Sequence, residues 1–208
     1  MDSSSGSPDA GDTGSSDGPG PADGVSASDG PHSSDSSPST ETGSGAKRVF
    51  ITRQKYQGNL TAGGGLAGGD AACSSAAQGA QLGGSWVAWL STTTVDAINR
   101  VNDVGPWHDM RGTLVFADKV TLATSPAASL WYDETGAMLA SDKIWTGTGY
   151  GGTYIAALSG TAPCGEWTST AMSDQAKVGQ VGRSDGAAWT AQSNTTCDQQ
   201  AHLICFEQ

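Results

Sequence analysis

Four cysteines are the residues of this 208-residue chain best suited to chemistry, and they could either bind zinc or form disulfides. No C-x-x-C pair occurs among them, and none of the three histidines stands beside them at metal-ligand spacing, which argues against zinc. An even number of cysteines in an acidic chain rich in Gly, Ser and Thr is typical of disulfides in an oxidising compartment. We therefore expect disulfides, with four reduced thiols in a cytoplasmic protein as the alternative. The cysteines are Cys73, Cys164, Cys197 and Cys205.

Catalytic chemistry is not favoured by the remaining polar residues. His108 stands next to Asp109 and serines are plentiful, but no Gly-x-Ser-x-Gly motif accompanies them. The segment from Trp107 to Met110 is instead predicted to be a loop with a partly buried indole. We expect no catalytic residue and no cofactor.

The chain has two parts of different composition, and the helices and strands that must position the cysteines lie in the second part, residues 47–208. Residues 1–46 contain 14 Ser, nine Gly, eight acidic residues and no aromatic residue, Lys or Arg, which predicts a disordered acidic linker. Residues 47–208 form the predicted domain, with all seven Trp and with 13 acidic against 10 basic residues. The net charge of −11 therefore belongs mostly to the linker. A nearly neutral domain does not favour nucleic-acid binding.

The pattern of residues 47–208 predicts an α+β domain with two early helices and many short strands. An alanine-rich helix is expected at 66–80, with Cys73 facing inward and Asp70 in an early turn where it suits the helix dipole. Thr92 to Thr94 offer an N-cap for a short helix at 95–101, and no later helix is expected. Residues 147–152 include four glycines and predict a flexible loop. The expected strands are 48–53, 85–91, 113–117, 129–132, 143–146, 166–169, 189–191 and 203–206.

Several motifs recur in one known architecture. A cysteine lies on the first helix, one begins the late loops, and Cys197-x7-Cys205 closes the chain within Ala201-His-Leu-Ile-Cys-Phe-Glu207. Further motifs are Arg48-Val-Phe-Ile-Thr52, Trp86-Val-Ala-Trp-Leu-Ser91, Asp133-Glu-Thr-Gly136 and Ile144-Trp-Thr-Gly147. Residues 47–208 thereby resemble the C-type lectin-like fold, and within it the endostatin-like bacterial domains of unknown function found on exported proteins. The resemblance implies a mostly antiparallel sheet with long loops and two nested disulfides, Cys73–Cys205 and Cys164–Cys197. Spacing alone leaves all three pairings open.

The resemblance does not bring the usual sugar site with it. Sugar-binding members of the fold bind calcium through Glu-Pro-Asn or Gln-Pro-Asp and through Trp-Asn-Asp, and neither motif occurs here. We therefore predict no metal site of that type. Asp133, Glu134 and Asp142 could serve an unrelated calcium site, although a solvated turn at 133–136 is favoured. The arginines are spread along the chain, which does not favour heparin-type binding.

Aromatic residues are the remaining candidates for ligand binding. Five tryptophans in or beside expected strands are predicted to lie in the core: Trp86, Trp89, Trp145, Trp167 and Trp189. Five aromatic residues in or near loops could instead stack on sugars or fill pockets of a partner. They are Trp107, Trp131, Tyr132, Tyr150 and Tyr154.

These observations favour a non-catalytic, adhesin-like extracellular binding module for a protein or glycan ligand. A low-complexity linker of this kind commonly follows the lipid-bearing cysteine of exported lipoproteins, so we expect an export signal upstream of Met1 and display at the outer cell surface. No apolar run approaches the roughly 18 residues that span a membrane. The alternatives are a structural envelope protein without a discrete ligand and a degenerate enzyme of the same fold.

Overall fold

The computed structural model of the chain describes residues 46–60, 63–160 and 162–208, all within one compact unit, Thr40–Gln208. Its class is α+β, with two sheets, one long helix and several very short ones. The predicted linker, apart from Ala46, lies outside the described residues.

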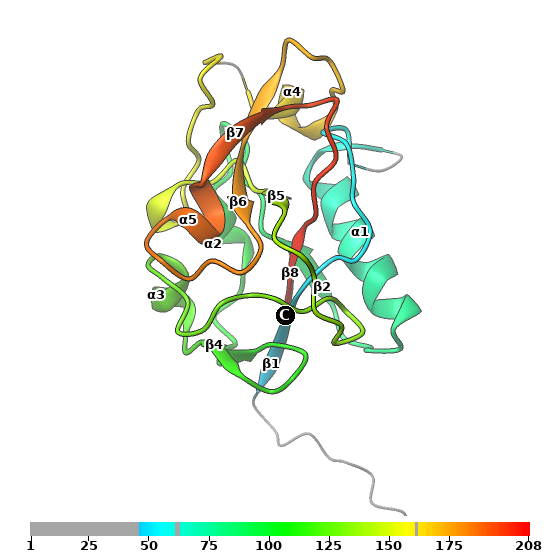
Figure 1. The fold of residues 1–208 in the computed structure, drawn as a ribbon, viewed down its shortest axis with the longest axis vertical. Helices are drawn as coiled ribbons and strands as arrows, with labels where there is room; N and C mark the ends of the chain where they lie inside the picture. Colours follow the sequence, from blue (N-terminus) through cyan, green and yellow to red (C-terminus); the bar gives the residue numbers. More distant parts are fainter. Residues whose placement is uncertain (1–45, 61–62, 161) are drawn as a thin grey trace, which may run out of the picture. The chain divides into compact units, whose positions relative to one another are not determined.

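A five-stranded sheet brings the first and last strands of the domain together (Figure 1). Its order is β2-β8-β1-β3-β4, and β1 runs antiparallel to β8 but parallel to β3. The C-terminal strand β8 thus lies between β1 and β2, which explains why all four of its residues are buried. The strands are β1 (Lys47–Ile51), β2 (Trp86–Ala88), β3 (Trp107–His108), β4 (Leu114–Phe116) and β8 (Ile204–Glu207).

A second, three-stranded antiparallel sheet has the order β5-β6-β7. An isolated bridge between Ile144 and His202 joins it to the segment that leads into β8. The outer strand β5 confirms the strand expected at 143–146, whereas the central strand β6 and the outer strand β7 were not expected, because they carry few β-branched apolar residues. The strands are β5 (Lys143–Trp145), β6 (Gln175–Gln180) and β7 (Ser193–Thr196).

Alternation along β1 and β8 divides the core in two. Phe50 and Cys205, which pair across the two strands, face the core cluster under the long helix. Val49 and Phe206 form the next pair and face the opposite cluster. Because successive strand residues point to opposite faces, both faces of this strand pair are apolar. The five tryptophans predicted to be core residues are all buried, as expected.

The long helix α1 (Gly65–Gly79) confirms the predicted alanine-rich helix and lies at the right of Figure 1. It packs very closely on the sheet, since a Cβ atom on Gly69 would come within 2.5 Å of the Leu90 side chain. Asp70 does not serve the helix dipole as predicted. Its Oδ1 instead accepts a hydrogen bond from the Ala88 N–H (2.9 Å), and Arg100 Nη2 donates to both carboxylate oxygens (2.6 and 2.7 Å). Asp70 therefore ties α1 to β2 and to the following helix.

The prediction that no helix follows residue 101 is wrong, because several one-turn helices occur later in the chain. Two of them replace the strands expected at 166–169 and 189–191, and 129–132 contributes only an isolated bridge at Tyr132. All four residues of α4 have a positive φ angle, which residues other than glycine rarely adopt, so nothing in their sequence predicts it. A segment of four residues is too short to show a helical period. The short helices are α2 (Ala97–Arg100), α3 (Lys119–Leu122), η1 (Tyr150–Gly152), α4 (Cys164–Trp167) and α5 (Ala188–Ala191).

The predicted flexible glycine loop at 147–152 is closely packed where it begins. Gly147 has a φ of 60°, and a Cβ atom there would lie 2.9 Å from both the Ser91 carbonyl oxygen and the Trp167 ring. Glycine is required at this position because the neighbouring backbone leaves no room for a side chain.

Two disulfides close the fold, and they join the pairs that the resemblance implies. Cys73 on α1 is bonded to Cys205 on β8, and Cys164 on α4 to Cys197 just after β7. All four side chains are fully buried. Two disulfides indicate folding in an oxidising, non-cytoplasmic compartment. None of the helices in the described part of the chain has the length and apolar character needed to cross a bilayer.

Candidate binding site

The prediction that Trp107 belongs to a loop surface is wrong. Trp107 begins β3, is fully buried, and donates a hydrogen bond from Nε1 to the Glu207 carbonyl oxygen (2.9 Å). Its ring meets Phe206 edge-on, with the ring centroids 5.7 Å apart. The residue is a core anchor of the sheet and has no surface to offer a ligand.

Trp131 and Tyr132 are partly buried rather than free. The Trp131 ring packs against the second core cluster. The Arg111 guanidinium lies over the Tyr132 ring at 5.5 Å, and the Tyr132 carbonyl oxygen accepts a hydrogen bond from the Ile51 N–H. These two residues mainly fix the start of the turn that follows them.

Tyr150 and Tyr154 lie in a different region, near α2. Tyr150 is 61% exposed, whereas Tyr154 is half-buried and donates its backbone N–H to Asp96 Oδ1 (2.7 Å). Figure 1 shows this yellow segment on the side of the domain away from α1. The five predicted aromatic residues therefore do not form one binding surface.

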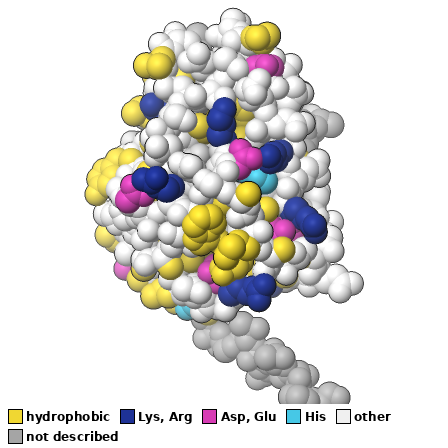
Figure 2. All heavy atoms as spheres, in the orientation of Figure 1, with side chains coloured by type: hydrophobic (Ala, Val, Ile, Leu, Met, Phe, Trp, Pro, Cys, Tyr) yellow, Lys and Arg dark blue, Asp and Glu magenta, His cyan; other side chains and the backbone are white. Residues whose placement is uncertain are grey.

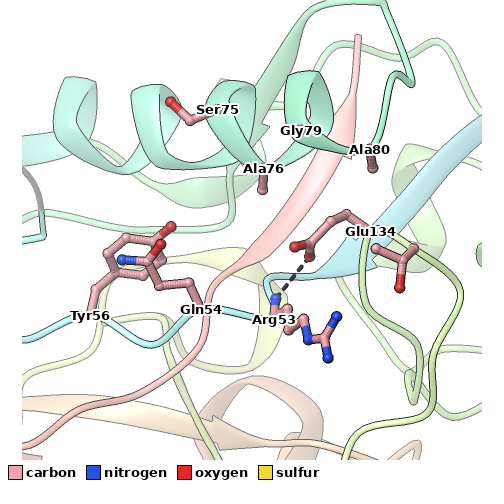
Figure 3. A pocket seen from close by; sticks show the side chains of 9 residues that line it. Arg53, Gln54, Tyr56, Ser75, Ala76, Gly79, Ala80 and Glu134 are labelled. Atoms are coloured by element: carbon pink, nitrogen blue, oxygen red, sulfur yellow. Dashed lines mark hydrogen bonds between the residues drawn. The ribbon is translucent and has the colours of Figure 1, made fainter. Parts of the chain in front are cut away.

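A pocket of about 330 Å³ lies instead between α1 and two loops (Figure 3). One loop follows β1, and the other is the turn that follows Tyr132. Figure 3 shows Ala76 on α1 and Ala80 just after it on the side of the helix that faces Glu134, with Tyr56 and Gln54 at the other end of the pocket. We call it the α1 pocket; its lining residues are Arg53, Gln54, Tyr56, Ser75, Ala76, Gly79, Ala80, Glu134 and Thr135.

Tyr56 is the best-fixed residue of the α1 pocket. Its backbone exchanges two hydrogen bonds with Ala201 (2.8 and 3.0 Å), and its carbonyl oxygen also accepts from Trp145 Nε1 (2.7 Å). Gly58, two residues on, donates to the Cys197 carbonyl oxygen (2.9 Å), which links this segment to a disulfide. The Tyr56 side chain is therefore held on rigid elements, as a preorganised binding residue must be.

The Tyr56 hydroxyl has no hydrogen-bond partner among the described residues, although the residue is only 8% exposed. Burial raises the pKa of this hydroxyl, and the nearby Glu134 carboxylate raises the pKa further. The group therefore keeps its proton at neutral pH and is available both to donate and to accept. Tyr56 lines the pocket, so a ligand there can replace water as the hydrogen-bond partner of this hydroxyl.

Glu134 is fixed through one carboxylate oxygen only. Its Oε2 accepts a hydrogen bond from the Arg53 backbone N–H (2.8 Å), while Oε1 has no partner in the part of the chain that the structure describes. The Arg53 side chain is 70% exposed, and its Nε lies 4.0 Å from Asp133 Oδ2. In Figure 3 the guanidinium points away from α1, so it borders the pocket without filling it.

The predicted turn at 133–136 is present, but the Asp133 side chain is buried within it and not solvated. The Asp133 side chain is only 1% exposed. Its Oδ1 accepts hydrogen bonds from the backbone N–H groups of Thr135 and Ala137, both at 2.9 Å, and from the Thr135 hydroxyl. These bonds hold Glu134 in place at the mouth of the pocket.

The carboxylates proposed for an unrelated calcium site are already engaged. Asp133 holds the turn, and Asp142 pairs with Lys55 and accepts from the Lys143 N–H (2.7 Å). Calcium takes six to eight oxygen ligands, and no cluster of three His, Cys, Asp or Glu side chains forms within the described ranges.

Charges on the domain surface are mixed. On the face drawn in Figure 2, Lys and Arg side chains lie beside Asp and Glu side chains. The ion pairs of the domain include Lys55 with Asp142 and Arg183 with Asp185. This mixture agrees with the nearly neutral composition of residues 47–208.

No family model matches the chain, and no curated protein sequence matches it. Sequence reasoning considered Glu134 only as a metal ligand and missed Tyr56, Gln54 and Ser75 altogether. These residues come from three separate segments without a shared motif, so only the fold brings them together.

Proposed function

We propose that the protein is an extracellular binding module of C-type lectin-like architecture that recognises a protein or glycan ligand without catalysing a reaction. The observation that carries this proposal is the α1 pocket, where several side chains have polar atoms that no other protein group pairs with in the described part of the chain. The pocket volume lies at the small end of the roughly 300–1,000 Å³ typical of ligand sites.

Display at the cell surface is part of the same proposal. Two disulfides support export, and the acidic linker of residues 1–46 would act as a tether to a lipid anchor supplied upstream of Met1. A tethered domain works as an adhesin-like module because the linker lets its pocket reach ligands away from the membrane.

Binding by the full, oxidised chain tests this function directly. The labelled protein is applied to arrays of immobilised glycans and of extracellular matrix proteins. The Ser75→Trp variant places a large ring at the exposed edge of the α1 pocket, whereas Gln78→Trp places the same ring on α1 outside the pocket lining. We expect wild type and Gln78→Trp to bind the same ligand and Ser75→Trp to lose it.

Two outcomes would contradict the proposal. If the folded, oxidised wild-type chain binds nothing on either array, a structural envelope role without a discrete ligand becomes the better account. If Ser75→Trp binds as well as wild type, the ligand lies elsewhere on the domain.

A further inference from the structure

The chemistry of the α1 pocket narrows its ligand, on the assumption that the proposed function is correct. Four side chains that line it have polar atoms without a protein partner within the described residues: Gln54, Tyr56, Ser75 and Glu134. The first three can each donate and accept hydrogen bonds, and the free carboxylate oxygen of Glu134 only accepts. A ligand hydroxyl group matches such a set because it also donates and accepts.

The charges around the pocket favour a neutral ligand. Glu134 and the buried Asp133 oppose an anionic group at the turn. The Arg53 guanidinium, 4.0 Å from Asp133, partly offsets these charges and so reduces the attraction of this edge for a cationic group. A neutral hydroxyl group meets no repulsion and loses less solvation on entering than an ion does.

The floor of the pocket suits the apolar C–H face of a sugar ring. Ala76 and Gly79 of α1, and Ala80 directly after it, expose only small apolar groups to the pocket, so a ring can lie close to the helix. Gln54, Ser75 and the other exposed lining residues leave the pocket open to solvent on one side. A volume of about 330 Å³ accommodates one sugar ring while the rest of a chain extends into solvent.

We propose that the α1 pocket is a calcium-independent site for a terminal neutral hexose of a glycan. Tyr56 and Glu134 bind its hydroxyl groups, Tyr56 by donating or accepting and Glu134 by accepting through Oε1. No cation is needed, because the protein groups themselves contact the hydroxyl groups.

The test uses the full, oxidised chain on a glycan array with neutral, acidic and amino-sugar termini, with either EDTA or added calcium. We expect binding to neutral termini to be equal in both conditions. Affinities are then measured by titration with the methyl glycoside of the sugar bound best. Tyr56→Phe removes one hydroxyl and should weaken binding roughly two- to tenfold. Glu134→Gln replaces the charged acceptor and should weaken it about tenfold or more.

Glu166→Gln is the matched control, because Glu166 accepts hydrogen bonds from Thr93 outside the pocket. It should bind like wild type, and a thermal melt of each variant confirms folding. Binding that EDTA abolishes, a preference for acidic or amino sugars, or unchanged affinity in Tyr56→Phe and Glu134→Gln would overturn the inference. Binding to matrix proteins alone would refute the inference but not the proposed function, whereas no binding at all would refute both.

Discussion

Removing the Cys73–Cys205 disulfide should destabilise the domain more than removing Cys164–Cys197. The two bridges span 132 and 33 residues of sequence. In the chain-entropy description, such loops correspond to about 5 and about 4 kcal/mol of stability. The shorter loop is nested within the longer one, which reduces the effective length of the longer loop to about 99 residues. The expected difference between the two bridges is then about 1 kcal/mol.

The assay compares two double variants of the full chain, Cys73→Ala/Cys205→Ala and Cys164→Ala/Cys197→Ala. All four cysteines are fully buried, so the cavities left by truncation are similar and largely cancel in the comparison. Urea unfolding followed by tryptophan fluorescence gives the free energy of unfolding of each variant. Because domains of this size are stable by about 5–15 kcal/mol, the loss of about 5 kcal/mol is a third or more of the total stability and is readily measured.

The opposite order would refute the reasoning. If Cys164→Ala/Cys197→Ala lost more unfolding free energy than the other variant, native contacts, and not loop length, would determine how much each disulfide stabilises the domain. The candidate contact is Gly58, where a Cβ atom would come within 2.8 Å of the Cys197 Cβ.

The remaining predictions concern single residues and use the same unfolding assay. Gly179→Ala should lower the free energy of unfolding by about 2–3 kcal/mol, because the new Cβ atom overlaps the backbone of α5. Gly79→Ala is the control: its new Cβ atom meets open space, so the free energy of unfolding should stay the same or rise by up to about 1 kcal/mol. Arg100→Met should cost about 2 kcal/mol by leaving Asp70 without its partner, and a loss below about 0.5 kcal/mol would contradict this role. Burial lowers the pKa of His202 in the folded state below its unfolded-state value of about 6.5. The stability that the neutral ring contributes is therefore fully present above pH 6.5, and it is lost as the pH falls from there toward the folded-state pKa. His202→Gln should lose less stability than wild type between pH 7.5 and pH 5, and an unchanged slope would contradict the assignment.

The parts of the fold that sequence could predict are those with a long or strongly apolar pattern. The alanine-rich segment predicts α1, and the apolar run before Phe206 predicts β8, because burial on both faces requires continuous apolar residues. The one-turn helices could not be predicted. Trp167, for example, is held in a left-handed turn by its burial, by the adjoining Cys164 disulfide and by a hydrogen bond from its ring to the Ser91 carbonyl oxygen (2.8 Å).

The candidate site was less accessible to sequence reasoning than the fold. Trp107 follows Gly105 and Pro106, which are typical of a loop, yet its pairing with β1 places it in the core. Tyr56 lies in a Gly- and Thr-rich segment that also reads as a loop, and its position depends on hydrogen bonds to Ala201, 145 residues later. Pairing between residues so far apart leaves no pattern in the sequence around either of them from which it could be predicted.

Amide NMR spectra of the 15N-labelled full chain, with and without a pool of methyl glycosides of neutral hexoses, test the central claim most directly. The account predicts chemical-shift changes confined to the α1 pocket, at Gln54, Tyr56, residues 75–80 at the end of α1, and Glu134. Changes centred instead on the exposed loop from Tyr150 to Leu158, or none at millimolar ligand, would contradict it.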